Sequence, residues 1–234
     1  MNIKSIFFPT DFTCDVCGVE TFKSNLCADC KKTVEFNNGI TCPLCGRKTV
    51  IPEICLECKA SPPLFRKAVS AFVYGGGSQI LIYKFKNGNG YLKEYFADLL
   101  APKISELTKV DYLIGVPMLR RDKTRRGYNQ SELLAKSLSK RTGIPYLNGA
   151  IKKVWVAAQQ KTLSRAQRAE NLKGCFKVEK PHLICGKKII IVDDVLTTGA
   201  TADELTRILI LAGATDVFLA TVASVEYKIK TARK

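Results

Sequence analysis

Eight of the ten cysteines in this 234-residue chain form four Cys-x-x-Cys pairs within the first 60 residues. The first two pairs recur 28 residues later, and in each repeat a glycine comes directly after the first pair, at Gly18 and Gly46. Two Cys-x-x-Cys turns can form a tetrahedral site of four thiolates, which suits Zn²⁺. We therefore predict that the paired cysteines bind zinc: Cys14, Cys17, Cys27, Cys30, Cys42, Cys45, Cys55 and Cys58.

Two arrangements of the zinc ions fit this spacing. In the sequential arrangement each 28-residue repeat binds its own ion; in the interleaved one, the first and third pairs share an ion, as do the second and fourth. The repeat slightly favours the sequential arrangement, because each repeat is then a closed unit. In either case the core is too small to fold alone, and metal binding is expected to supply the folding free energy.

Disulfide bonds are the main alternative for these cysteines. The N-terminus lacks the long apolar core and the cleavage site of a secretory signal, so we expect a reducing, cytoplasmic compartment and free thiolates. Four tandem pairs also differ from a redox dithiol, which needs one pair near a βαβ unit. Apolar runs such as 188–192 are far too short to span a bilayer, so no membrane span is expected.

The net charge of +16 is unevenly distributed. Residues 1–60 carry seven basic and seven acidic side chains, whereas residues 118–177 carry 15 basic and three acidic ones. A concentrated positive field favours polyanions, either nucleic acid or a small ligand rich in phosphate. The alternative is a solvated basic face that only aids solubility.

After the linker at 61–63, strands and helices are predicted to alternate. Alternation of this kind implies an α/β fold with a mainly parallel sheet covered on both faces. We accordingly divide the chain into a zinc-binding module at 1–60 and an α/β domain at 61–234. Strands are expected at 67–74, 111–116, 151–156, 174–179, 187–192 and 215–222, and helices at 78–86, 91–107, 128–142 and 201–212.

Residues 189–201 are the most informative part of this domain. A buried strand is predicted to end at Asp193 and Asp194, followed by a short loop of hydroxyl residues and glycine, and then by a helix. Residues 201–204 fit the Ser/Thr-x-x-Glu capping box that marks a helix start. A loop at a helix N-terminus offers free backbone N–H groups to phosphate. The predicted phosphate-binding residues are Thr197, Thr198, Gly199, Ala200 and Thr201.

The two carboxylates would repel an anion unless they bind something else, and ribose hydroxyls and Mg²⁺ are suitable partners. The alternative is an ordinary strand-to-helix turn with a solvated Asp pair. The sequence contains neither the Gly-Lys-Ser/Thr of a nucleotide-binding P-loop nor a Gly-x-Gly-x-x-Gly dinucleotide fingerprint at this position.

Residues 189–201 resemble the phosphoribosyl pyrophosphate (PRPP) signature of type I phosphoribosyltransferases. Three further stretches are similar to elements of the ComF/GntX branch of that family: the Arg-Gly-Tyr-Asn-Gln run within 125–130, the segment 160–171 followed by 174–176, and the helix around 81–86. With the cysteine module, the resemblance covers nearly the whole chain.

The resemblance implies a type I phosphoribosyltransferase-like fold that binds PRPP with Mg²⁺, and a role in natural competence. It implies a pyrophosphate loop beginning at Pro117 and a polar segment around Gln160 that can close over the site. The resemblance also implies the residues that would act on PRPP: Asp193, Asp194, Arg126, Arg165 and Arg168.

Three functions are consistent with the sequence. The first is an active phosphoribosyltransferase with an unknown acceptor. The second is a non-enzymatic PRPP-binding protein that handles incoming single-stranded DNA or its import machinery. The third, which depends on the +16 charge, is a DNA-binding zinc protein with a degenerate enzyme fold. Few aromatic residues lie near the basic cluster, so stacking platforms for single strands are not evident.

Overall fold

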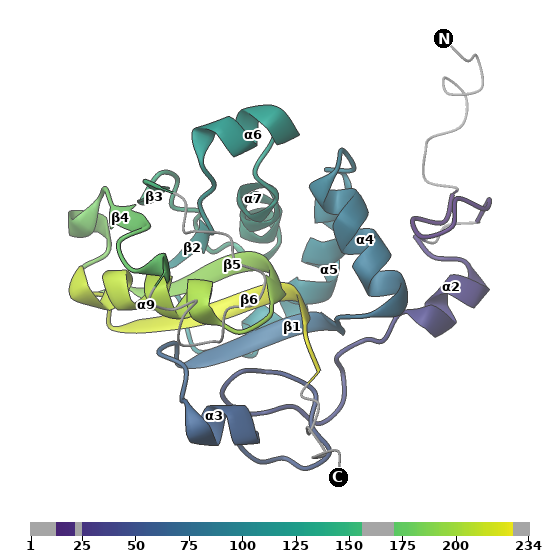
Figure 1. The fold of residues 1–234 in the computed structure, drawn as a ribbon, viewed down its shortest axis with the longest axis horizontal. Helices are drawn as coiled ribbons and strands as arrows, with labels where there is room; N and C mark the ends of the chain where they lie inside the picture. The colour runs from purple at the N-terminus through teal and green to yellow at the C-terminus, as the bar shows by residue number, and fades with distance from the viewer. Residues whose placement is uncertain (1–12, 22–24, 156–170, 227–234) are drawn as a thin grey trace.

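In the computed structural model, which describes residues 13–21, 25–155 and 171–226, four strands form a wholly parallel sheet in the order β1-β6-β5-β2 (Figure 1). Crossover connections place neighbouring strands of the sheet far apart in the sequence. The strands of this sheet are β1 (Lys67–Val73), β2 (Tyr112–Gly115), β5 (Lys188–Leu196) and β6 (Asp216–Ser224).

Helices alternate with these strands along the chain, which confirms the predicted α/β class. Among the described residues, the cysteine module contains the short helices α2 (Ala28–Thr33) and α3 (Leu56–Ala60). The helices of the α/β part are α4 (Gly76–Lys86), α5 (Leu92–Ser105), α6 (Arg120–Arg126), α7 (Gln130–Thr142) and α9 (Ala200–Leu211), with a 3₁₀ turn, η1, at Pro181–Leu183.

The two faces of the sheet have separate hydrophobic clusters. Successive residues of a strand point to opposite faces, and β5 follows this rule closely. Ile190 and Val192 pack with α4, α5 and α7, whereas Ile189 and Ile191 pack with α9. Because both faces are covered, the centre of β5 is a continuous apolar run, as is typical of parallel sheets.

The strands expected at 151–156 and 174–179 lie outside the main sheet. They are shorter than expected, β3 (Ile151–Lys153) and β4 (Phe176–Val178), and they pair antiparallel with each other. Helix α6 was not expected at all. None of its residues is buried, so it has no apolar face that could have revealed it as a helix.

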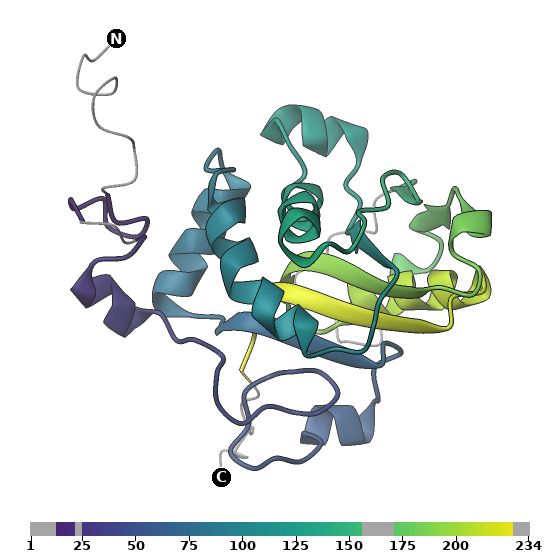
Figure 2. The same ribbon diagram turned by 180° about the vertical axis from the view of Figure 1, so that it is seen from behind.

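The 28-residue cysteine repeat appears as two matching hairpins. The isolated bridges Thr13–Glu20 and Thr41–Lys48 lie at equivalent positions, and Gly18 and Gly46 have φ of 79° and 65°. We call the repeats the first ribbon (13–33) and the second ribbon (41–60). The first ribbon lies beside α4 and the second below β1, well separated in both views (Figures 1 and 2).

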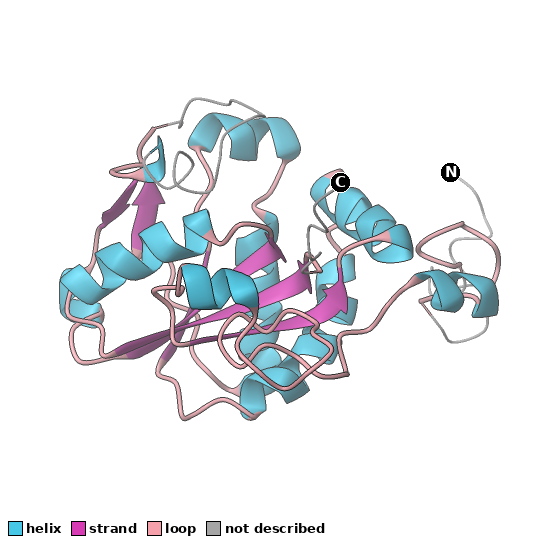
Figure 3. Ribbon diagram, turned by 60° about the horizontal axis from the view of Figure 1, so that its bottom comes forward, coloured by secondary structure: helices cyan, strands magenta, loops and turns pink. Residues whose placement is uncertain are grey.

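The second ribbon is the more closely joined to the sheet. Its loops lie over β1 when the molecule is tilted (Figure 3), and its four cysteines belong to the hydrophobic cluster that includes Ile189 and Ile191. The first ribbon contacts α4, where the Lys84 ammonium donates to the Val16 carbonyl at 3.2 Å. No helix within the described residues is both long and apolar enough to cross a membrane.

Candidate functional site

The predicted site lies where β5 extends beyond β2. The last pair between these strands joins Gly115 to Val192, and β5 then continues along β6 as far as Leu196. The strand was expected at 187–192, with the two carboxylates at its end. It is longer because β6 remains available as a pairing partner after β2 has ended. The two carboxylates that follow Val192 are therefore inside the strand, at an edge open on one side.

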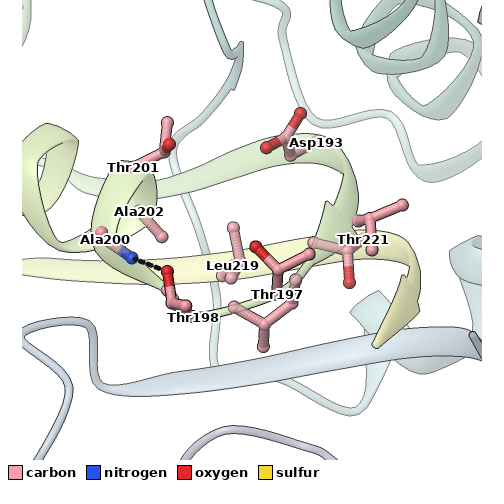
Figure 4. Close-up of a pocket in the computed structure, with 11 residues that line it drawn as sticks. Asp193, Thr197, Thr198, Ala200, Thr201, Ala202, Leu219 and Thr221 are labelled. Atoms are coloured by element: carbon pink, nitrogen blue, oxygen red, sulfur yellow. Dashed lines mark hydrogen bonds between the residues drawn. The ribbon is translucent and has the colours of Figure 1, made fainter. Parts of the chain in front are cut away.

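Since neighbouring residues of a strand point in opposite directions, Asp193 and Asp194 have different surroundings. The Asp193 carboxylate accepts hydrogen bonds from the Ser131 hydroxyl at 3.0 Å and from the Asp194 backbone N–H at 2.9 Å. It lines a pocket at the start of α9 (Figure 4). Burial and the charge of Asp194 raise the pKa of Asp193 to about 7.

Asp194 does not line this pocket; it faces α4 and α7. The Gln130 amide donates to one of its oxygens at 2.7 Å, and the Lys86 ammonium lies 2.9 Å from the other. Only 9% of the Asp194 side chain is exposed, so this carboxylate is a buried anion with a cation and an amide as partners. The Arg126 guanidinium joins the same network by donating to the side-chain oxygen Oε1 of Gln130 at 2.8 Å.

The sequence analysis assigned no role to Lys86, Gln130 or Ser131. Lys86 and Gln130 do lie within the stretches that carry the family resemblance, at the end of 81–86 and of 125–130. Their contact with Asp194 joins residues 108 and 64 positions apart in the chain. A signal was thus present in the motifs, but only the packing of α4 and α7 reveals the partner.

The N-terminus of α7 is placed against the site by the rest of the Arg-Gly-Tyr-Asn-Gln run. The Asn129 side chain caps α7 by accepting from the Ser131 N–H at 3.0 Å, and it donates to the Val116 carbonyl at 2.9 Å. A Cβ on Gly115 would lie 2.7 Å from the backbone of Ser131, so glycine is required for this close approach. Gln130 and Ser131 reach the carboxylates for this reason.

The loop between β5 and α9 forms the rest of the pocket. Gly199 has φ of +85°, a conformation that favours glycine, and is the N-cap of α9. The backbone N–H groups of Thr198 and Gly199 have no acceptor within the described residues. All five predicted phosphate-binding residues line the pocket. The complete lining is Asp193, Val195, Leu196, Thr197, Thr198, Gly199, Ala200, Thr201, Ala202, Leu219 and Thr221.

Thr221 is a further site residue that the sequence analysis missed. It lies opposite Asp193 in the ladder between β5 and β6. Its hydroxyl is buried and has no hydrogen-bond partner among the described residues. An unpaired buried hydroxyl is costly unless something binds to it. This orphaned donor is consistent with a polar ligand in the pocket.

The predicted capping box at 201–204 is wrong. Helix α9 begins at Ala200, and no side chain caps it. Glu204 is instead buried, where it accepts from both the Arg207 guanidinium at 2.8 Å and the Gly174 N–H at 3.1 Å. The Ala200 N–H donates a long hydrogen bond of 3.5 Å to the Thr198 hydroxyl (Figure 4), and the N–H groups that follow it in the first turn remain available to an anion.

The other predicted site residues have different positions. Pro117 follows β2 and is half-buried, and the basic helix α6 begins three residues later, so the expected pyrophosphate loop is short. Arg126 lies at the end of α6. Gln160, Arg165 and Arg168 lie outside the described residues. Their roles stay predictions.

The two cysteine groups are sequential, so the interleaved arrangement is wrong. Each ribbon brings its own four sulfurs within 4.8 Å of one another. Four sulfurs at about 2.3 Å from a tetrahedral zinc ion lie about 3.8 Å apart. The Sγ atoms of Cys17 and Cys27 are 3.8 Å apart, and those of Cys45 and Cys55 are 3.7 Å apart. This donor set therefore fits structural zinc in both ribbons.

The thiols of the second ribbon also need a cation. Burial raises the pKa of Cys45 to about 12, with a further contribution from the neighbouring thiol of Cys42. Although burial opposes it, backbone N–H groups, including that of Cys55, lower the pKa of Cys42 to about 7. Without a metal ion, only part of this group is ionised at neutral pH, because the thiolates repel one another.

Comparisons with known families agree with this architecture. The family described as "Phosphoribosyl transferase domain" matches residues 124–234, and the "Double zinc ribbon domain" matches residues 3–59. Together with the parallel sheet and the two groups of four cysteines, these matches define a phosphoribosyltransferase-type α/β protein with a double zinc ribbon.

Two curated relatives identify the branch. Competence protein F from Haemophilus influenzae is 31% identical over 85% of this chain and 91% of its own length. The DNA utilization protein YhgH from Escherichia coli O157:H7 is 33% identical over 67% of this chain and 71% of its own length. The chain belongs to the ComF family of competence proteins.

Two solved structures illustrate the similarity in fold, both at low sequence identity. Adenine phosphoribosyltransferase from Trypanosoma brucei has a TM-score of 0.42 and 14% identity, covering 84% of this chain and 66% of that one. The allosteric regulatory enzyme of purine biosynthesis has a TM-score of 0.38 and 23% identity over 56% of this chain. The match covers 25% of the length of that enzyme.

Proposed function

We propose that the chain binds Mg²⁺ and PRPP in the pocket between β5 and α9, and that it is a phosphoribosyltransferase with an unidentified acceptor. The single observation that carries this proposal is the unpaired, buried hydroxyl of Thr221 in the pocket that Asp193 and the Thr198 and Gly199 amides also border. A hydroxyl, a carboxylate and free amides suit a sugar phosphate better than an apolar ligand.

In this proposal each part of the site has one task. The N–H groups of the loop and of the first turn of α9 bind the 5-phosphate. Asp193 is the carboxylate available to ribose hydroxyls and Mg²⁺, which prefers oxygen ligands. Asp194 is bound by Lys86 and Gln130, so it becomes available only when Lys86 is displaced. Bound Mg²⁺ would supply positive charge for the pyrophosphate.

Transfer would proceed at the ribose C1. The bond from C1 to pyrophosphate breaks, and its electron pair stays on the leaving oxygen. A lone pair of the acceptor forms the new bond to C1, and the acceptor then loses a proton. The basic groups assigned to the leaving pyrophosphate are Arg126, Arg165 and Arg168, with the backbone after Pro117. We propose a cytoplasmic location for this activity, because a reducing compartment keeps zinc-binding thiolates from forming disulfides.

The experiment is a calorimetric titration of PRPP with Mg²⁺ into wild-type protein and Asp193→Asn. Asparagine retains an acceptor for the Ser131 and Asp194 donors, so the fold is expected to be intact, whereas binding should weaken at least about tenfold, as for loss of one charged contact. Asp29→Asn is the matched control, because Asp29 is an exposed aspartate on α2. Equal affinity in wild type and Asp193→Asn would refute the proposal.

A second candidate function is binding of single-stranded DNA or of the DNA import machinery, without catalysis. The observation that favours it is α6, whose basic residues Arg120, Arg121, Lys123 and Arg125 are all exposed. The names of the relatives, a competence protein and a DNA utilization protein, are also consistent with work on DNA. Under this candidate, PRPP would be bound but not consumed.

This candidate predicts a strong dependence of oligonucleotide affinity on salt, since the attraction is to phosphates. Fluorescence anisotropy at several salt concentrations measures the slope. Arg121→Gln combined with Arg125→Gln should reduce the slope by about 1.4, the value for two phosphate contacts on a single strand. Affinity that does not change with salt would exclude this mode of binding.

A further inference from the structure

Arg47 connects the second ribbon directly to the phosphate loop. It follows Cys45 and Gly46 in the ribbon, and only 6% of its side chain is exposed. Its guanidinium forms an ion pair with Glu57, which lies between Cys55 and Cys58, and donates to the backbone carbonyl of Thr197. These two contacts join the second cysteine group to a loop that is 150 residues away in the sequence.

The ribbon that carries Arg47 has a fixed position on the sheet. The Ala68 N–H of β1 donates to the Leu44 carbonyl at 2.8 Å. A Cβ on Gly46 would lie 2.2 Å from the Ala68 carbonyl oxygen, so only glycine permits this approach. The Asn37 amide also donates to the Gly46 carbonyl at 2.8 Å. Arg47 is therefore anchored at its backbone on one side and bound at its guanidinium on the other.

The contact with Thr197 determines the orientation of one peptide group. In a trans peptide the carbonyl and the following N–H point in opposite directions. When Arg47 holds the Thr197 carbonyl toward the ribbon, the Thr198 N–H must point away from the ribbon. The Thr198 N–H is one of the pocket amides that have no acceptor within the described residues. Arg47 thus keeps this peptide from turning over.

Packing supports the same connection. Leu196 and Ala202, which flank the phosphate loop, belong to the hydrophobic cluster that contains all four cysteines of the second ribbon. The Leu64 N–H, just after the ribbon, donates to the Asp203 carboxylate of α9 at 2.9 Å. The first ribbon lies on the opposite side of the sheet core, with Cys14 and Cys30 in the other cluster.

We infer that Arg47 is a positioning residue for the phosphate loop, and that metal in the second ribbon supports the loop through it. Metal in the first ribbon has no such effect. Zinc fixes Cys45 and the α3 turn that bears Glu57, and these in turn fix the guanidinium. The inference about affinity rests on the proposed function, whereas the inference about loop order does not.

The experiment compares Arg47→Met and Arg47→Lys with wild-type full chain. The matched control is Lys48→Met, because Lys48 is the next residue and forms its ion pair with Glu35 on the surface. Hydrogen exchange measured by mass spectrometry follows the amides of 197–201, and calorimetry follows binding of ribose 5-phosphate. Zinc content measured by atomic emission shows whether each variant retains its metal.

Arg47→Met should speed exchange of the loop amides and weaken ribose 5-phosphate binding, each by about tenfold, the scale of one charge-assisted hydrogen bond. Arg47→Lys should restore both quantities only in part. The lysine ammonium is a single point charge and cannot donate to both Glu57 and Thr197 as the guanidinium does. Lys48→Met should change neither quantity. Unchanged loop exchange in Arg47→Met would overturn the inference.

Cysteine variants test the role of the metal separately. Cys58→Ser, in the second ribbon, should speed loop exchange, whereas Cys17→Ser, in the first ribbon, should leave it unchanged. Equal effects from the two variants would overturn the inference. If wild-type protein binds neither ribose 5-phosphate nor PRPP while loop exchange still depends on Arg47, the proposed function fails and the positioning role remains.

Discussion

At the scale of single residues, the adjacent carboxylates of β5 differ because a strand turns them to opposite faces. The buried carboxylate of Asp194 is paired with the Lys86 ammonium and accepts from the Gln130 amide, so both of its oxygens have partners. Asp193 accepts from a hydroxyl and a backbone N–H, and these bonds, with the more distant charge of Lys86, do not offset burial beside a second negative charge. The two residues are therefore suited to different tasks, one to structure and one to ligand.

This difference predicts a pH dependence of stability. The pKa of Asp193 is raised to about 7 in the folded protein, so the folded state binds a proton that the unfolded state releases near pH 4. The unfolding free energy should consequently fall as pH rises from about 4 to about 7. Asp193→Asn lacks this proton, and its stability relative to wild type should rise over that range by about 1 kcal/mol or more.

Urea unfolding without Mg²⁺ or ligand, measured for both proteins at pH 4.5 and 7.5, tests this expectation. Because the two proteins differ only at this residue, the comparison separates the proton on Asp193 from the groups that titrate elsewhere in the chain. A difference in stability that is the same at both pH values would contradict the assignment of a raised pKa to Asp193.

At the scale of elements, the site depends on how β5, the loop and α9 meet. The loop turns sharply into the helix through Gly199, without a side-chain cap. The opposite side of the site depends on α7 approaching the end of β2, where Gly115 leaves room for its backbone. The turn and the close approach each occur at a glycine, so backbone geometry sets the positions of the loop amides and of Gln130.

Gly199→Ala tests the loop. A Cβ there would meet only Leu196 and Asp203, at 3.7 and 3.9 Å, so the space is sufficient. The cost is conformational, because φ of +85° is unfavourable for alanine, and we expect a loss of about 1 kcal/mol in unfolding free energy together with weaker PRPP binding. Thermal unfolding and calorimetry measure the two effects.

Gly39→Ala is the matched control for this change. Gly39 has no positive φ, and nothing lies within 4 Å of the position of its Cβ. Its replacement should change stability by less than about 0.5 kcal/mol and leave binding unaltered. A loss in Gly199→Ala no larger than in Gly39→Ala would mean that the loop adopts another conformation in solution.

At the scale of the whole molecule, the two ribbons are equivalent in sequence but not in position. The first packs beside α4 with Cys17 exposed, whereas the second has all four cysteines buried against the sheet. We propose that the boundary expected at residue 60 separates the zinc module by sequence only, and that the second ribbon folds as part of the α/β core. Its contacts with Ala68 and Thr197 support this view.

Features carried by consecutive residues were predictable from the chain alone. The spacing of Cys42 and Cys45 predicts a metal knuckle, and the order of strand, carboxylates, small residues and helix around Gly199 predicts the loop at the start of α9, because each depends on local backbone geometry. The parallel sheet followed from the alternation of strands and helices. The capping box failed because α9 begins at Ala200, which puts Thr201 inside the helix, and Glu204 accepts from Arg207 instead.

Only the packed molecule decided which distant residues meet. Lys86 reaches Asp194, and Arg47 reaches Thr197, because α4 and the second ribbon dock on opposite faces of one sheet. The sequential pairing of the cysteines was also settled in this way. Contacts between residues so far apart depend on the docking of whole elements, which no short pattern encodes, and they determine that one carboxylate faces the pocket while the other is bound by lysine.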